Sequence, residues 1–134
     1  MKLALLSSIS GLLGAFITFA FGGWSQLLTI LMLAVGIDYV SGVLAAIKSG
    51  KGLCSSVGFW GLARKGLMLL VILLAHHVDV LLGLQNVTMS AAIYFYLTNE
   101  LISIAENYSR IGLPMPAVFS KIIKVLKEKE QEQK

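Results

Sequence analysis

Long apolar segments separated by short polar connections dominate the pattern of the chain. Residues 3–37 carry no charge. A bilayer core is about 30 Å thick and takes roughly 20 helical residues to cross, so this stretch is long enough for two crossings. The sequence Phe-Gly-Gly-Trp-Ser-Gln at 21–26 supplies the turn between them, because paired glycines interrupt a helix and Trp24 suits the membrane interface. A cleaved signal peptide is the alternative for the first crossing, but its apolar region is long and no Ala-x-Ala site follows.

Two more apolar segments follow, which gives four expected transmembrane helices. The expected spans are about 3–21, 27–47, 66–84 and 87–105. We therefore predict an all-α integral membrane bundle formed by residues 1–113, followed by a tail at 114–134. The fourth span is the weakest, since a strong apolar residue favours insertion by roughly 0.3–0.6 kcal/mol whereas one acid opposes it by roughly 3 kcal/mol. Because this span contains Asn99 and Glu100, we expect it to need neighbouring helices.

From Pro116 onward the pattern changes to that of a basic amphipathic helix. Apolar side chains recur on one face, at Val118, Phe119, Ile122, Ile123 and Leu126. Lysines take the other face, at Lys121, Lys124 and Lys127. Such a helix beside a membrane is expected to lie on anionic headgroups, with about 1 kcal/mol per lysine near the surface; a helix end surrounded by water is the alternative. The last residues, 128–134, are expected to be disordered.

Composition supports a membrane protein and excludes a soluble globular domain. Of the 134 residues, 57% are hydrophobic and only 13% are charged, whereas about a quarter of the residues in soluble domains are charged. The single cysteine, Cys54, excludes an internal disulfide.

The basic residues indicate how the chain is oriented. Lys2 precedes the first span, four basic residues fall between the second and third, and Arg110 and the tail lysines follow the fourth. By the positive-inside tendency, both termini face the cytoplasm. A protein with three spans and an external N-terminus is the alternative, which also keeps the basic loop and the tail inside. The basic residues expected to meet lipid headgroups are Lys48, Lys51, Arg64, Lys65, Lys121, Lys124 and Lys127.

Three acids lie within the expected spans, where an ionisable side chain is costly and usually faces other helices or water. Each shares a helical face with small residues, which let helices approach closely, so that polar groups can bond across the contact. The candidate helix-contact or pore-lining residues are Asp38, Gly42, Asp79, Gly83, Glu100, Ser7, Gly11 and Gly14. Two interpretations are open. These faces either form subunit contacts that later line a wet hole, or the acids only cap and join helices in a static bundle.

No pattern in the chain indicates an enzyme. His76 and Asp79 share a helical face, but His77 points elsewhere and no third ligand converges, so a His–Asp hydrogen bond is expected and no metal site. No glycine-rich phosphate loop follows a strand, no catalytic triad can be argued, and no aromatic-interleaved basic patch suggests nucleic acid. We expect no cofactor, no metal ion and no nucleic-acid partner.

From Asp38 to Pro116 the chain resembles the bacteriophage holin family, which also includes clostridial toxin-secretion holins. The matching stretches are Asp-Tyr-Val-Ser-Gly at 38–42 with Ala46, Lys-Ser-Gly-Lys at 48–51, Ser-Ser-Val-Gly at 55–58 with Gly61, Arg64 with Lys65, Asp79, Asn99 with Glu100, Ser103, Glu106 with Asn107, and Gly-Leu-Pro-Met-Pro at 112–116. The resemblance implies a non-enzymatic lysis protein that oligomerises in the cytoplasmic membrane of the bacterial host. Its lesions would release endolysin or a toxin, and no direct contact with endolysin is required.

Two other classes of function stay open on the sequence. A small proton-coupled transporter could use the intramembrane carboxylates to bind protons and cations in turn. An accessory membrane subunit could instead present its small-residue stripes to a larger complex.

Overall fold

The computed structural model describes residues 1–50 and 55–133, and every regular element among them is a helix. The helices are α1 (Lys2–Phe21), α2 (Gln26–Lys48), α3 (Ser55–Leu82), α4 (Val87–Ile111) and α5 (Ala117–Glu132). The predicted all-α class is confirmed. Lys51 and Cys54 lie outside the described residues.

Three of these helices are long and apolar enough to cross a membrane. The spans in α1, α2 and α3 have mean hydropathies of 2.0, 2.1 and 1.8. α4 is not among them, in line with the weak fourth segment expected from the sequence. Instead it packs between neighbours, and it buries polar Thr98 and Asn107 as well as apolar Ile93 and Leu97.

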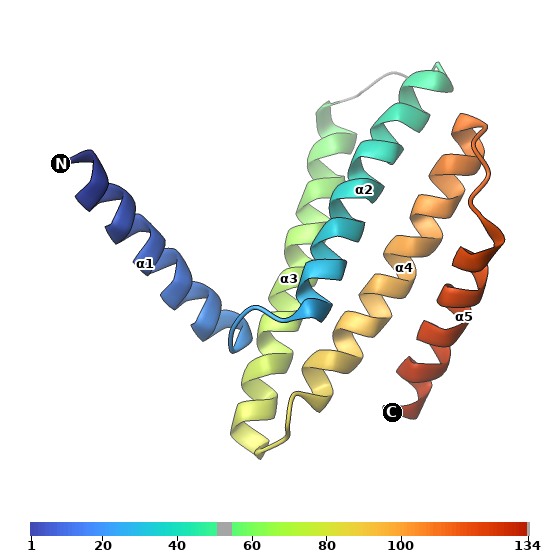
Figure 1. Ribbon diagram of the computed structural model, residues 1–134. Helices are drawn as coiled ribbons and strands as arrows, with labels where there is room; N and C mark the ends of the chain where they lie inside the picture. The colour runs from blue at the N-terminus through green and yellow to red at the C-terminus, as the bar shows by residue number, and fades with distance from the viewer. Residues whose placement is uncertain (51–54, 134) are drawn as a thin grey trace.

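The helices α2, α3 and α4 run side by side in alternating directions, and α5 folds back along α4 (Figure 1). Their shared core contains the fully buried side chains Leu28, Leu31, Ile72 and Ile93. α1 leans away from this bundle and contacts only α3 among the described helices (Figure 1). Most of α1 therefore presents apolar side chains to its surroundings.

Local signals in the sequence set the helix ends. Gly22 ends α1 with φ +73°, and Gly112 ends α4 with φ +92°, a backbone conformation that glycine adopts at no steric cost. The Ser25 hydroxyl caps α2 by accepting a hydrogen bond from the Leu28 N–H at 3.2 Å. The turn predicted at 21–26 is confirmed: it lies between the glycine that ends α1 and the serine that caps α2.

Two boundaries differ from the sequence expectation. α3 begins at Ser55, about ten residues before the expected span, so Arg64 and Lys65 lie on a helix and not in a loop. Residues 55–65 contain no proline, so nothing in their backbone prevents the helix from starting this early. The expectation of disorder at 128–134 is wrong for the described part, since α5 continues to Glu132. Its Lys, Glu and Gln residues are good helix formers.

Candidate functional site

A buried ionic network joins the three central helices of the bundle. The Lys65 ammonium of α3 lies 2.7 Å from a carboxylate oxygen of Asp38 in α2 and 2.7 Å from one of Glu100 in α4. These side chains are only 12–14% exposed. One cation therefore holds two acids from different helices, because buried charges need opposite charges and hydrogen bonds.

Asn107 extends the network on the α4 side. Its Nδ2 amide donates to Asp38 Oδ1 at 2.9 Å, and also lies 3.1 Å from Ser41 Oγ and 3.2 Å from the Asp38 carbonyl oxygen. A Cβ at Gly42 would lie 3.4 Å from the same amide nitrogen, so the missing side chain leaves room for Asn107. Gly42 thus lies at a contact between α2 and α4.

The network lies well inside the bundle. Lys48, the last residue of α2, donates a hydrogen bond to the Ile111 carbonyl at the end of α4, so these helix ends lie together. We call this end, which carries Lys48 and Arg110, the basic end. Asp38 lies ten residues before Lys48 in α2, and a helix rises 1.5 Å per residue, so the network is about 15 Å from the basic end.

A polar cleft between α2, α3 and α4 leads to this network. Two adjoining hollows of about 390 Å³ and 430 Å³ share the lining residues Asp38, Gly61, Arg64, Lys65 and Ser103. Arg110 lines the hollow nearer the basic end, and Asn99 lines the other. Hydrophilic side chains therefore follow one side of the bundle from its basic end to beyond the network.

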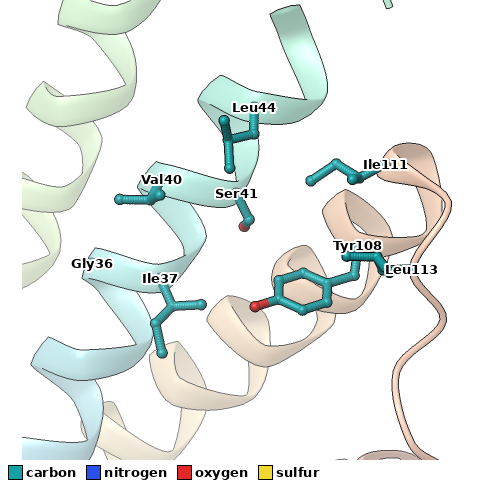
Figure 2. Close-up of a pocket in the computed structure, with 8 residues that line it drawn as sticks. All are labelled: Gly36, Ile37, Val40, Ser41, Leu44, Tyr108, Ile111 and Leu113. Carbon is teal, nitrogen blue, oxygen red and sulfur yellow. The ribbon is translucent and has the colours of Figure 1, made fainter. Parts of the chain in front are cut away.

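The groove between α2 and the end of α4 is apolar by contrast. This hollow of about 350 Å³ lies beside Ser41, and its remaining walls are the residues Gly36, Ile37, Val40, Leu44, Tyr108, Ile111 and Leu113. Figure 2 shows the Tyr108 ring directed from α4 toward α2 across the groove. A surface of this composition suits lipid chains or apolar side chains.

Asp79 lies apart from the network and caps a helix. Its two carboxylate oxygens accept hydrogen bonds from the backbone N–H groups of Thr88 at 2.9 Å and Met89 at 2.8 Å, and the residue is 1% exposed. Asp79 thus satisfies the first amides of α4, which otherwise lack helical partners. It lies 14 residues beyond Lys65 in α3, about 21 Å along the helix axis.

The histidines hold α1 on α3. A Cβ at Gly22 would lie 2.6 Å from His76 Cε1, and the rings of Phe19 and His77 have centroids 4.7 Å apart. No group of three potential metal ligands occurs among the described residues. The hydrogen bonds of Asp79 go to backbone amides, and no His76–Asp79 hydrogen bond of the expected kind joins the two side chains in the described structure.

The candidate small residues of α1 have no partner helix within the described chain. Ser7 is exposed, and nothing lies within 4 Å of a Cβ built at Gly11 or Gly14. Gly83 is also in open space, and its φ of +65° marks the end of α3. The tail lysines Lys121, Lys124 and Lys127 are exposed on α5.

A sequence model of the bacteriophage holin family matches residues 15–128. The chain belongs to the bacteriophage holin family. It is 40% identical over 119 residues to an uncharacterised protein of Listeria monocytogenes, covering 89% of this chain and 84% of that one. An uncharacterised protein of Halalkalibacterium halodurans is 39% identical over 132 residues, covering 95% and 97%. A protein of Bacillus phage phi105 named a probable holin is 38% identical over 105 residues, covering 78% and 76%. No solved structure shows a significant match.

Sequence reasoning about this holin-family membrane protein missed two members of the network. Asn107 continues the stripe of Glu100 and Ser103 by one helical turn, so the signal was present. Lys65 was assigned to lipid headgroups, because the start of α3 was placed after it. Its spacing from Gly58 and Gly61 would have put it on a helix-contact face.

Proposed function

We propose that the chain acts as a holin that oligomerises in the bacterial cytoplasmic membrane, opens lesions and releases endolysin or a toxin from the cell. Membership of the holin family and the similarity to a phage protein named a probable holin support this role. Three helices that suit a bilayer support residence in the membrane. The protein acts without enzymatic chemistry, cofactor or metal ion, and needs no direct contact with endolysin.

The observation that carries the proposal is the buried network of Asp38, Lys65 and Glu100. A charge exposed to the hydrocarbon core of the membrane is costly, by about 2.5–3.5 kcal/mol or more at the bilayer centre. Helices α2, α3 and α4 can therefore separate only where water replaces the lost partners. Separation in an assembly of several copies would turn the polar cleft into the wall of a hydrated opening, while the same side chains keep a single bundle closed.

Other surfaces supply contacts for such an assembly. α1 exposes small residues that allow close approach, and the apolar groove between α2 and α4 accepts nonpolar side chains. We propose that the basic end faces the cytoplasm, because Lys48 and Arg110 lie together there, and that the N-terminus, two spans earlier, faces the same side. The sequence expectation that α5 lies on the membrane surface differs from the structure, in which α5 starts at the basic end and packs back along α4. Only the start of α5 therefore lies close to the headgroups of that side.

Inducible expression in bacteria tests the proposal, with membrane potential and release of a cytoplasmic enzyme recorded together. We expect abrupt loss of both at a defined time after induction. Replacing Glu100 with glutamine removes one of the two negative charges of the network, so it should change the time at which the membrane opens. Glu106→Gln removes the same charge from an exposed position of α4 and should leave the time unchanged.

Two outcomes would count against a holin, and a third against the role of the network. Harmless accumulation in the inner membrane would remove the basis for lesion formation. Saturable flux of a small solute without lysis would indicate a transporter that uses the carboxylates of the cleft. Identical timing in the wild type, Glu100→Gln and Glu106→Gln would show that the network plays no part in opening.

A further inference from the structure

Two arginines that have no ion-pair partner among residues 1–50 and 55–133 line the same hollow near the basic end. Arg64 of α3 and Arg110 of α4 both line the hollow of about 430 Å³ between α2, α3 and α4. No hydrogen bond or ion pair joins either guanidinium group to another residue in the part of the chain that the structure describes. Lys48 and Lys65, by contrast, are engaged with a carbonyl and with two carboxylates.

The acids near this hollow offset only part of the charge of the two arginines. Asp38 and Glu100 are each held by Lys65 at 2.7 Å. Glu106 precedes Arg110 by one helical turn, but it is exposed and forms no ion pair with it within the described residues. Asp38, Lys65 and Glu100 together carry one net negative charge, so the two arginines leave the hollow with a net positive charge. That charge lies on planar guanidinium groups, which bind phosphate oxygens through paired N–H donors.

The remaining wall of the hollow suits the apolar part of a lipid. Tyr39, Val43 and Ala46 of α2 line it on one side, and Val57 of α3, 71% exposed, lines it on another. The hollow thus combines an anion-binding mouth with an apolar wall. A free phosphate ion would contact only the two guanidinium groups and leave the apolar wall uncovered.

The height of the arginines in the membrane also fits a lipid headgroup. With 28 residues, α3 is about 42 Å long, so it extends beyond a hydrocarbon core of about 30 Å. Side chains of a helix lean toward its N-terminus, which for α3 lies at the basic end. The long side chain of Arg64 can therefore reach the headgroup level, where Arg110 lies at the end of α4.

We propose that this hollow is a binding site for one anionic phospholipid, whose phosphate is held jointly by Arg64 and Arg110. Basic pockets between spanning helices on the cytoplasmic side are known to accept such headgroups. A shared phosphate would tie α3 to α4 at the basic end and stabilise the closed bundle. The site requires only that the protein resides in a membrane, so it does not depend on lesion formation.

The test measures lipid-dependent stability of the full-length protein in a neutral detergent. The thermal unfolding midpoint is measured at increasing concentrations of short-chain phosphatidylglycerol. Phosphatidylcholine and inorganic phosphate are titrated in parallel. We expect phosphatidylglycerol alone to raise the midpoint. Arg64→Gln and Arg110→Gln should each weaken its apparent affinity about tenfold or more, since each removes charge-assisted hydrogen bonds. Lys2→Gln, the same charge change at the exposed start of α1, should leave the affinity unchanged.

Several results would overturn the proposal. Equal stabilisation by inorganic phosphate would assign the mouth to a free anion. An equal loss of affinity in Lys2→Gln would indicate diffuse charge attraction instead of a site, and unchanged affinity in both arginine variants would exclude the site. If an arginine variant unfolds without lipid, native mass spectrometry of the wild-type protein provides the test. One phosphatidylglycerol molecule bound in preference to phosphatidylcholine supports the site. Equal binding of the two lipids rejects it.

Discussion

Replacing Lys65 with methionine should destabilise the bundle more than any other single loss of a positive charge. The variant keeps the length of the side chain but leaves Asp38 and Glu100, only 12–13% exposed, without their shared cation. Both carboxylates lie 2.7 Å from one nitrogen, so their oxygens are at most twice that distance apart and repel each other once it is gone. Removing one partner of a buried ion pair costs about 3–5 kcal/mol. That loss shifts the unfolding equilibrium by a factor of about 100 to several thousand.

Unfolding of the purified full-length protein by sodium dodecyl sulfate, followed by circular dichroism, measures this loss. Lys48→Met is the matched control, because Lys48 is exposed and donates only to one carbonyl, a bond of about 0.5–1.5 kcal/mol. Adding Asp38→Asn and Glu100→Gln to Lys65→Met should restore most of the stability, since no uncompensated charge remains. Equal losses in Lys65→Met and Lys48→Met would refute this reasoning, as would a triple variant no more stable than Lys65→Met.

Three further substitutions test other contacts of the bundle. Asp79→Ala removes two hydrogen bonds to the start of α4 and should lower the unfolding free energy by about 1–3 kcal/mol in the same titration; a loss below about 0.5 kcal/mol would contradict the capping role. Gly22→Ala places a Cβ 2.6 Å from the His76 ring and should increase the distance between spin labels on α1 and α3, whereas Gly23→Ala, also at a positive φ but in open space, should change it less. Asn107→Leu should cost about 1–3 kcal/mol by leaving buried acceptors unpaired, and full stability of this variant would show that the amide is dispensable.

The helical architecture follows from the sequence because it depends on local signals. Apolar runs of membrane length, paired glycines and prolines predict where α1, α2 and α4 lie. The start of α3 was misjudged for a physical reason. A charged residue such as Lys65 lowers the hydropathy of a segment whether it faces water or two carboxylates, so composition alone cannot distinguish a loop from a helix that carries a buried ion pair.

The site could be predicted only in part. The two acids and the small residues of α2 were found, because acids are rare in apolar segments. Their pairing depends on rotation of α2, α3 and α4 about their axes, which is fixed by packing across residues far apart in sequence. The separate role of Asp79 has a local origin instead: the turn at 83–86 brings its carboxylate to the amides of Thr88 and Met89, nine and ten residues later.

That cap also bears on how the chain is made. The carboxylate that completes α4 belongs to α3, so the two helices form a hairpin whose hydrogen bonds close only when residues 88–89 have emerged from the ribosome. α4 on its own gains little by partitioning from the translocon into lipid. We therefore expect cotranslational insertion to release both helices as a pair, so that the second half of the topology is settled late in synthesis.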